Sequence, residues 1–444
     1  MTAHPGHRDH APSMRRDFLK QSSLAAAVTA GGLSLARSAH AAGSDVLRVG
    51  VIGCGGRGTG AVVNALKADP NARLVAMADA FGERARQSLQ TLTSQAEAQG
   101  IASDQLDVDE EHVFDGFDGY RKVFDCDLDV VLLTATPHFR PMHLEAAVAA
   151  GAHIFCEKPV AVDGPGARRV LAAVEEAEAK GLNIVSGFCW RYHPAVQETM
   201  QRVLDGAIGE IASIQETYLT GALWHRGHEP DWTEMEYQMR NWYYFTWLSG
   251  DHNVEQAVHS LDKMVWVMGN QPPQRAWGLG GRQVRVDPRY GHIYDHHAVV
   301  YEYPGNVHAH FYTRQQPGCY NHVDDFFFGT KGHCEVLQHQ IFGENPWRYR
   351  GPGGNMYDLQ HVALFNAIRE GERINDGQFM THSTMTAILG RMVNYTGQAL
   401  TYEEALDSSE ELAPADYGWD ADPPILPDEE GRYPVAMPGV TPFV

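Results

Sequence analysis

The sequence predicts an α/β fold in which an N-terminal Rossmann-type, doubly wound parallel sheet precedes an α+β domain with a large, mainly antiparallel sheet. Three observations predict it. Short apolar runs alternate with helical patterns from Val46 to about residue 185, and a glycine-rich turn follows the first run. Beyond Trp190, strand-like stretches follow one another with few helices between them, as in an antiparallel sheet.

The N-terminal elements alternate in the order of a βαβ fold. Near-continuous apolar runs are typical of parallel strands that are buried on both faces. Such runs predict strands at Leu47–Ile52, Arg73–Ala78, Val130–Thr134, His153–Cys156 and Asn183–Gly187. Helical periodicity predicts the intervening helices at Thr59–Ala68, Gly82–Gln99, His143–Ala150 and Gly164–Gly181.

The second half has a different pattern. Alternating residues predict strands at Ile211–Thr220, Arg275–Val286, His296–Tyr303, Val307–Arg314, Asp324–Gly329 and His333–Leu337. Helices are expected at Val196–Leu204, Asn253–Met268, Met356–Glu370 and Thr381–Gly397. The segment Ala222–Gly250 is crowded with aromatic residues and lacks a period, which predicts a loop insertion. The tail from Ser408 is acidic, rich in proline and expected to be irregular.

Composition excludes several classes of protein. The 444 residues are 43% hydrophobic and 20% charged, and no run of about 18 apolar residues predicts a membrane span. The formal net charge of −21 disfavours nucleic-acid binding, because phosphate contacts need lysine and arginine. Six cysteines occur without a metal-ligand or disulfide spacing, so buried free thiols are expected.

The N-terminus has the order of an export signal. Arg15-Arg16-Asp17-Phe18-Leu19-Lys20 resembles a twin-arginine motif, and an apolar stretch and Ala39-His40-Ala41 follow it. These features predict recognition by the twin-arginine export machinery and a periplasmic or other extracytoplasmic location. The expected organisation is therefore a signal peptide at 1–41, an NAD(P)-binding Rossmann domain at 45–187, a substrate and oligomerisation domain at 188–405 and an irregular tail at 406–444.

A dinucleotide site is predicted at the first strand–helix turn. Gly53-Cys54-Gly55-Gly56-Arg57-Gly58 fits G-x-G-x-x-G, whose small residues let a pyrophosphate approach the helix N-terminus. Asp79 ends the second strand, 21 residues after Gly58. A carboxylate there accepts hydrogen bonds from ribose hydroxyls and repels a 2′-phosphate, so NAD is preferred over NADP.

Two later strand ends complete the predicted site. Thr136, Pro137 and His138 follow the strand Val130–Thr134, at the sheet edge where ligands bind in such folds. Glu157-Lys158-Pro159 follows the strand His153–Cys156. A lysine there lies beside the nicotinamide and is suited to relaying a hydroxyl proton.

These motifs, together with Arg191-Tyr192-His193-Pro194, resemble the Gfo/Idh/MocA oxidoreductases over about Val46 to Leu400. The resemblance implies that Lys158 is catalytic. It also implies an acidic residue and a histidine four apart on the first helix of the second domain. Here Glu255 replaces the usual aspartate and His259 matches, so both are expected to face one cleft. A core histidine bonded to Asp262 is the alternative for His259.

The remaining candidates concern the substrate. Arg191 is expected to line the cofactor or sugar site. Flat aromatic side chains suit sugar rings, although they pack equally well in a core; these candidates are Trp190, Trp224, Trp242, Tyr243 and Tyr244. No metal site is predicted, because the histidines at 292, 296, 297, 308 and 310 alternate like strand residues and lack a carboxylate cluster.

The predicted function is hydride transfer between a tightly bound nicotinamide cofactor and a sugar or polyol carbinol, in an exported homo-oligomer. The same residues also suit an NAD-dependent glycoside hydrolase that transiently oxidises C3 of the sugar and eliminates the aglycone. That alternative needs a base for the C2 proton, for which a tyrosine of the Trp224–Tyr244 region is a candidate. A dinucleotide-binding sensor without activity is a third alternative.

Overall fold

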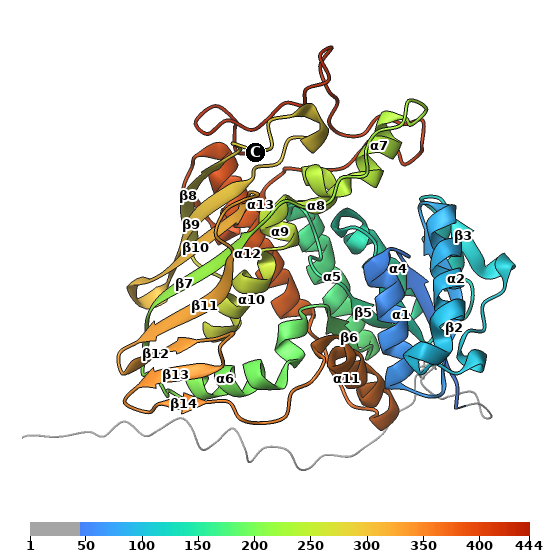
Figure 1. Cartoon of the computed structure of the whole chain (residues 1–444), viewed down its shortest axis with the longest axis horizontal. Helices are drawn as coiled ribbons and strands as arrows, with labels where there is room; N and C mark the ends of the chain where they lie inside the picture. Colours follow the sequence, from blue (N-terminus) through green and yellow to red (C-terminus); the bar gives the residue numbers. More distant parts are fainter. Residues whose placement is uncertain (1–44) are drawn as a thin grey trace, which may run out of the picture. The chain divides into compact units, whose positions relative to one another are not determined.

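The computed structural model describes residues 45–444, and the predicted signal at 1–41 lies outside the described residues. Two sheets organise the described chain (Figure 1). The first is parallel throughout and has the strand order β3-β2-β1-β4-β5-β6. Its strands are β1 (Leu47–Ile52), β2 (Ala72–Asp79), β3 (Val113–Asp115), β4 (Val130–Leu133), β5 (His153–Cys156) and β6 (Ile184–Ser186). This is the order of the Rossmann fold, and β1 and β4 flank its switch point.

Helices connect and cover these strands. They are α1 (Gly56–Ala68), α2 (Gly82–Gln99), α3 (Gly119–Phe124), α4 (Arg140–Ala150) and α5 (Gly164–Lys180). The residues of β4 are all buried, which explains the unbroken apolar run seen in the sequence. The predicted parallel, doubly wound sheet is confirmed.

The second sheet has nine strands in the order β14-β13-β12-β11-β7-β10-β9-β8-β15. Neighbours are antiparallel except β7 and β10, so the sheet is mixed and mainly antiparallel, as predicted. Its strands are β7 (Ile211–Thr220), β8 (Arg275–Gly281), β9 (His296–Tyr303), β10 (Val307–Gln315), β11 (His322–Gly329), β12 (Gly332–Glu335), β13 (Gln340–Gly343), β14 (Trp347–Arg348) and β15 (Leu400–Thr401).

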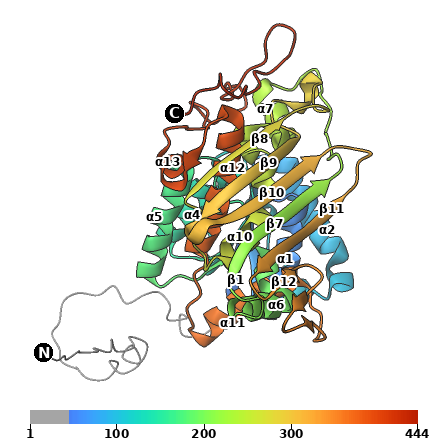
Figure 2. The same cartoon turned by 90° about the vertical axis from the view of Figure 1, so that its left-hand side faces the viewer.

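Helices cover the inner face of this sheet. The helices of the second half are α6 (Pro194–Leu204), α7 (Glu234–Arg240), α8 (Thr246–Ser249), α9 (His252–Glu255), α10 (Val258–Val267), α11 (Met356–Glu370), α12 (Gly377–Thr396) and α13 (Tyr402–Asp407). Buried residues of α10, α12, β9 and β10 share one apolar cluster with α5 and β5. Figure 2 shows the opposite face of β8, β9, β10 and β7, over which no helix of the described residues lies.

Two predictions about local structure were wrong. The helix expected at Asn253–Met268 is divided into α9 and α10, with a break at Gln256 and Ala257. The segment expected to be a loop insertion contains α7 and α8. Its aromatic residues form a buried cluster, so tertiary packing stabilises helices that have no clear amphipathic period.

Candidate active site

The glycine turn after β1 has the close packing that a dinucleotide site requires. Gly53 has φ +97°, and a Cβ there would lie 2.3 Å from the backbone nitrogen of Ala135. A Cβ on Gly58 would lie 1.8 Å from the Gly53 carbonyl oxygen. By contrast, Cβ atoms on Gly55 and Gly56 would meet nothing within 4 Å. The start of α1 therefore offers open space over its backbone N–H groups, where a diphosphate fits.

Asp79 lies beside this turn, at the end of β2. Its carboxylate accepts hydrogen bonds from the backbone N–H of Cys54 at 2.7 Å and of Phe81 at 3.0 Å. Burial raises the pKa of Asp79, whereas Arg84 and these two N–H donors oppose that shift. The structure thus brings Asp79 to the glycine turn, at the position that the sequence assigns to the ribose.

The end of β4 lies against the same turn. The Thr134 hydroxyl donates to the Gly53 carbonyl oxygen at 2.7 Å. The Thr136 hydroxyl is buried and has no partner among the described residues, and Pro137 begins a 3-10 helix. The His138 ring is buried, which lowers its pKa to about 3, and its Nε2 lies 2.7 Å from the Tyr417 hydroxyl.

An ion pair joins the glycine turn to the end of β5. Arg57 donates through Nε to the Glu157 carboxylate at 2.5 Å, and its guanidinium lies over the rings of Phe155 and Tyr357. A Cβ on Gly187 would lie 2.5 Å from Glu157 Oε2, so the end of β6 packs closely against this carboxylate. Glu157 therefore holds two edges of the site together, and Lys158 follows it directly.

Lys158 points at the break between α9 and α10. Its ammonium donates to the Glu255 carbonyl oxygen at 2.5 Å and lies 3.3 Å from the Glu255 carboxylate oxygen Oε1. In an unbroken helix that carbonyl would accept from the N–H of His259. Here the His259 N–H bonds instead to the Gln256 carbonyl at 3.4 Å. The lysine therefore takes the acceptor that a continuous helix would use.

His259 lies within the same group of charges. Its side chain is partly buried, and the ring nitrogen Nδ1 is buried without a partner among the described residues. Burial lowers the pKa of His259 well below its usual value, and the Lys158 and Lys263 ammonium groups lower it further. A neutral imidazole next to an ammonium is suited to accepting a proton. The structure thus brings Lys158, Glu255 and His259 together.

Arg191 is engaged elsewhere. Its guanidinium donates to both Asp262 carboxylate oxygens at 2.9–3.0 Å and to Asn270 at 2.8 Å, and it lies 3.7 Å above the Phe379 ring. Asp262 is thus bonded to Arg191 and to the Ser383 hydroxyl at 2.8 Å. These contacts lock the 3-10 helix Cys189–Tyr192 onto α10 and α12. The assignment of Arg191 to the cofactor or sugar stays a prediction.

The predicted aromatic residues fall into two groups. Tyr243 and Tyr244 are buried in the cluster around α7 and α8, and the Tyr243 hydroxyl accepts from Gln315 at 2.8 Å. Trp224 and Trp242 are partly exposed, with ring centroids 6.0 Å apart. Trp190 packs against the main core. Trp224 is therefore the most exposed of the aromatic candidates, and Trp190 and Trp242 are both partly buried against a core cluster.

Sequence reasoning missed three side chains near Lys158. The Cys189 thiol and the Tyr357 hydroxyl are hydrogen-bonded to each other, and Lys158 and Glu157 act on the Cys189 thiol electrostatically. Tyr218 of β7 is half-buried, and burial raises its pKa, with the Glu255 carboxylate as the next cause. No spacing motif identifies these residues, because they come from separate elements. Tyr218 lies on the inner face of its strand, since Ile214 and Glu216 on that side are buried.

One predicted strand histidine joins a buried network. The Asp251 carboxylate oxygen Oδ1 lies 2.8 Å from His252 Nδ1 and 3.2 Å from His297 Nε2, and Oδ2 accepts from the Tyr395 hydroxyl at 2.5 Å. These are hydrogen-bond distances. The network fixes Asp251, which has φ +88° at the start of α9, and so supports the segment that carries Glu255.

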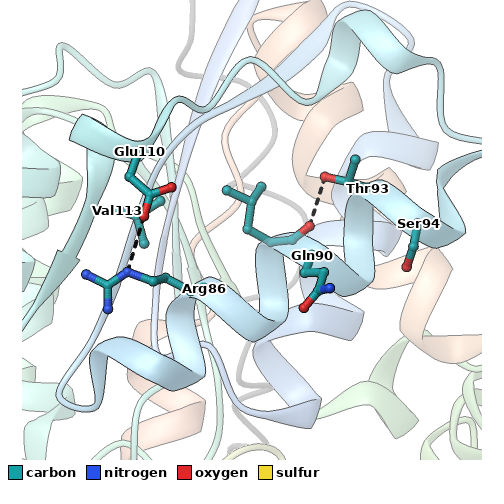
Figure 3. A pocket seen from close by; sticks show the side chains of 7 residues that line it. Arg86, Gln90, Thr93, Ser94, Glu110 and Val113 are labelled. Carbon is teal, nitrogen blue, oxygen red and sulfur yellow. Dashed lines mark hydrogen bonds and ion pairs between the residues drawn. The ribbon is translucent and has the colours of Figure 1, made fainter.

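A surface hollow lies apart from these groups, between α2 and the start of β3 (Figure 3). Its polar contacts are local. Arg86 pairs with Glu110 at 3.4 Å, and the Thr93 hydroxyl donates to the Leu89 carbonyl at 2.9 Å. No helix of the described residues is long and apolar enough to cross a membrane.

Together, the sheet order, the glycine turn and Asp79 define a nucleotide-binding Rossmann protein with a second, sheet-based half. Residues 47–184 match the Gfo/Idh/MocA profile, described as an oxidoreductase family with an NAD-binding Rossmann fold. This segment of the chain is therefore similar to that family. The predicted cofactor, NAD, is the one that the family fold binds.

Individual relatives are distant. The chain is 26% identical over 226 residues to inositol 2-dehydrogenase of Rhizobium meliloti, which covers 51% of this chain and 56% of the relative. It is 26% identical over 228 residues to 2,7-anhydro-N-acetylneuraminate hydratase of Escherichia coli, covering 50% of this chain and 54% of the relative. The chain thus spans about half the length of these two curated relatives.

Solved structures share the fold over a longer stretch. Scyllo-inositol dehydrogenase of Lactobacillus casei, solved with bound NAD(H) and scyllo-inositol, has a TM-score of 0.60 at 17% identity, covering 81% of this chain and 99% of that one. Aldose-aldose oxidoreductase of Caulobacter crescentus has a TM-score of 0.59 at 18% identity, covering 80% and 99%. This similarity extends through both sheets and shows the fold.

Proposed function

We propose that the protein transfers hydride between a tightly bound NAD and a secondary alcohol of a sugar or polyol. One observation carries the proposal: the Lys158 ammonium, the Glu255 carboxylate and the neutral His259 ring meet at the carboxyl edge of the Rossmann sheet. These are the groups that alcohol oxidation needs beside a nicotinamide.

The residues at the glycine turn fit NAD. Gly55 and Gly56 leave room for the diphosphate, and the Asp79 carboxylate lies where a ribose would be bound. When bound there, NAD would supply the hydride acceptor. Protein side chains then have to carry out the proton transfer. The Arg57–Glu157 ion pair joins the glycine turn to the end of β5 and so fixes the position of Lys158, the next residue, relative to the turn.

The protein side of the reaction follows from these contacts. Lys158 donates a hydrogen bond to the substrate hydroxyl in place of the Glu255 carbonyl, which orients the carbinol and stabilises the oxygen as its proton leaves. His259 accepts that proton, because burial and two nearby ammonium groups keep its ring neutral. Glu255 holds the ammonium in place from the side. In the reverse direction His259 returns the proton.

An incubation with assorted monosaccharides, polyols and glycosides tests the proposal. We expect an oxidised sugar and a reduced cofactor, or an oxidised and a reduced sugar in equal amounts when two substrates are present. Release of free aglycone without net oxidation would instead establish the glycoside hydrolase, for which Tyr243 of the predicted region and Tyr218 of β7 are candidate bases, because the Glu255 carboxylate acts on both hydroxyls electrostatically. Binding of NAD without any turnover would establish the sensor.

Export through the twin-arginine machinery is part of the proposal. It is supported by the sequence of residues 15–41 alone, and that route carries folded proteins with their cofactor. Replacing Arg15 and Arg16 with lysine is expected to leave the chain in the cytoplasm, as cell fractionation would show. Extracytoplasmic protein in that variant would exclude this route.

We also propose that two copies pair through the open face of the nine-stranded sheet. Large apolar side chains are exposed there: Trp277 (43%), Leu279 (68%), Tyr312 (42%) and Phe328 (39%). Leu279→Glu is expected to convert a dimer into a monomer in light-scattering measurements, whereas Val440→Glu in the tail should not. A monomeric wild type, or a Leu279→Glu dimer, would contradict this pairing.

A further inference from the structure

The loops that follow β2, β3 and β4 lie at the carboxyl edge of the Rossmann sheet, where β2 and β3 are separated from β5 and Lys158 by β1 and β4. They carry Phe81 after β2, Phe117 after β3 and His138 after β4. Asp79, which marks the ribose position, is two residues before Phe81 and accepts from its N–H. In a Rossmann sheet the acidic residue at the end of the second strand binds the adenosine ribose, so the adenosine half of a dinucleotide lies near the loop after β2.

The C-terminal segment, residues 412–433, packs onto these same loops. The Trp419 ring lies 4.8 Å, between centroids, from both Phe81 and Phe117. The Tyr417 hydroxyl lies 2.7 Å from His138 Nε2, and its ring lies 6.0 Å from that of Phe117. A segment predicted to be an irregular tail thus provides an aromatic wall over the adenosine side.

The helix α7 closes the wall from a second direction. The Arg240 guanidinium lies 4.2 Å above the Phe81 ring and 4.9 Å above the Trp232 ring. It also pairs with Glu83 at the start of α2 at 3.0 Å. Rings of α7, α8 and the C-terminal segment share one buried cluster with Phe81 and Phe139.

The wall is firmly attached to the rest of the protein. The Thr233 hydroxyl donates to the Trp419 carbonyl at 2.6 Å, and the Gln238 amide donates to the Ile425 carbonyl at 2.7 Å. The Tyr433 hydroxyl donates to the Glu234 carboxylate at 2.5 Å. At the first residue of the segment, the Leu412 N–H donates to the Asp163 carboxylate, which precedes α5, at 2.8 Å. The segment is therefore held at both ends and in the middle.

We infer that residues 412–433 and α7 together form an adenosine subsite that encloses the adenine end of bound NAD and slows its release. The partly exposed Trp419 ring supplies an apolar face on which an adenine stacks, the buried Phe81 ring supports it from behind, and the Arg240–Glu83 pair ties α7 to the loop after β2. An exported enzyme has no pool of free NAD to draw on. It must therefore keep its cofactor bound through successive turnovers. This inference rests on the proposed NAD-dependent function.

The dissociation rate of NADH tests it without a sugar substrate. The purified full chain is loaded with NADH and mixed with excess NAD⁺, and the decay of NADH fluorescence gives the rate. Trp419→Ala removes two aromatic contacts, so release should be about tenfold faster or more. Arg240→Met should also accelerate release. Met437→Ala, at an exposed site later in the tail, should match the wild type within about twofold.

The outcomes separate this subsite from the proposed function. If NADH dissociates from the wild type and from the variants at the same rate, the proposed adenosine subsite is wrong, whereas NAD binding itself is still supported. If Trp419→Ala binds NADH more tightly than wild type, the segment is a plug and the inference is overturned. If the wild type binds no NADH, both proposals fall. Should Trp419→Ala not fold, as circular dichroism would show, the Arg240→Met rate decides.

Discussion

The Lys158 ammonium donates to the backbone carbonyl of Glu255 at 2.5 Å, which couples the end of a Rossmann strand to a break in a helix of the other half. That carbonyl is free for the lysine because α9 ends at Glu255 and α10 begins at Val258. The break and the ammonium therefore depend on each other. They place an ion pair of half-buried side chains beside His259.

The pH dependence of turnover follows from His259. Burial and the Lys158 and Lys263 charges lower its pKa below the usual 6.5, so the ring stays neutral and able to accept a proton down to lower pH. We expect the acid limb of kcat/KM to have its midpoint below pH 6.5, and His259→Asn to abolish that limb. Steady-state rates across pH check this, and a midpoint above pH 6.5 that persists in His259→Asn would exclude the role.

Cofactor choice should depend on the Asp79 charge. Asp79→Asn keeps the shape of the side chain and an acceptor for one of the Cys54 and Phe81 N–H groups, which donate to different carboxylate oxygens, and it removes the charge that repels a 2′-phosphate. We expect the wild type to prefer NADH over NADPH and the variant to narrow that preference by about tenfold or more. Fluorescence titrations measure the dissociation constants of NADH and NADPH. Asp118→Asn, at an exposed site, serves as the control, and an equal ratio in all three proteins would contradict the assignment.

The Arg191–Asp262 pair should matter mainly for stability. Both side chains are buried, and removing one leaves an uncompensated charge in the interior. Arg191→Met is expected to reduce the free energy of unfolding by about 3–5 kcal/mol. Chemical denaturation measures the loss, with the exposed Arg202→Met, which breaks a surface pair with Glu198, as the matched control. If Arg191→Met is fully stable but no longer binds NADH, the predicted cofactor contact of Arg191 would replace this structural role.

The fold should lose stability in mild acid. Burial lowers the pKa of His138, His143, His292 and His361 to about 3 and of His252 to about 4. The unfolded chain binds these protons below pH 6.5 and the folded chain does not, so stability falls as pH drops below 6.5, by up to about 1.4 kcal/mol per pH unit for each ring.

Carboxyl groups with a raised pKa act in the opposite direction. Burial raises the pKa of Asp376 to about 6, so its contribution to stability increases as pH falls. Burial also raises the pKa of Asp79, Asp163, Glu216 and Asp325. The nine described histidines with a lowered pKa outnumber these five carboxyl groups, and we expect the melting temperature to decrease steadily from pH 6.5 to 4.5. A melting temperature that is constant over this range would show that the buried rings are protonated in the folded state.

Much of the Rossmann half could be predicted from the sequence, because its signals are local. The apolar runs at Leu47–Ile52 and His153–Cys156 match β1 and β5 residue for residue. The short β3 and α3 were missed, since three strand residues give no period. The glycine turn and Asp79 were found together because their spacing along the chain reflects one βαβ unit.

Other features of the site depend on contacts between distant segments. The break after Glu255 is invisible in the periodic pattern of Asn253–Met268, because the Lys158 ammonium that takes the carbonyl comes from 97 residues earlier. Tyr218 of β7 interacts with Glu255, Tyr357 of α11 contacts Cys189 and Arg57, and Trp419 reaches Phe81 from the irregular tail. Local patterns carry no information about such pairs.

The most direct test is a single turnover by NAD-loaded protein, followed at 340 nm after mixing with a panel of sugars and polyols. We predict that absorbance rises with at least one of them, that Lys158→Ala slows the rise by about 10²–10⁴-fold while binding NADH normally, and that the exposed Lys180→Ala does not. Equal rates in the wild type and Lys158→Ala would contradict the account.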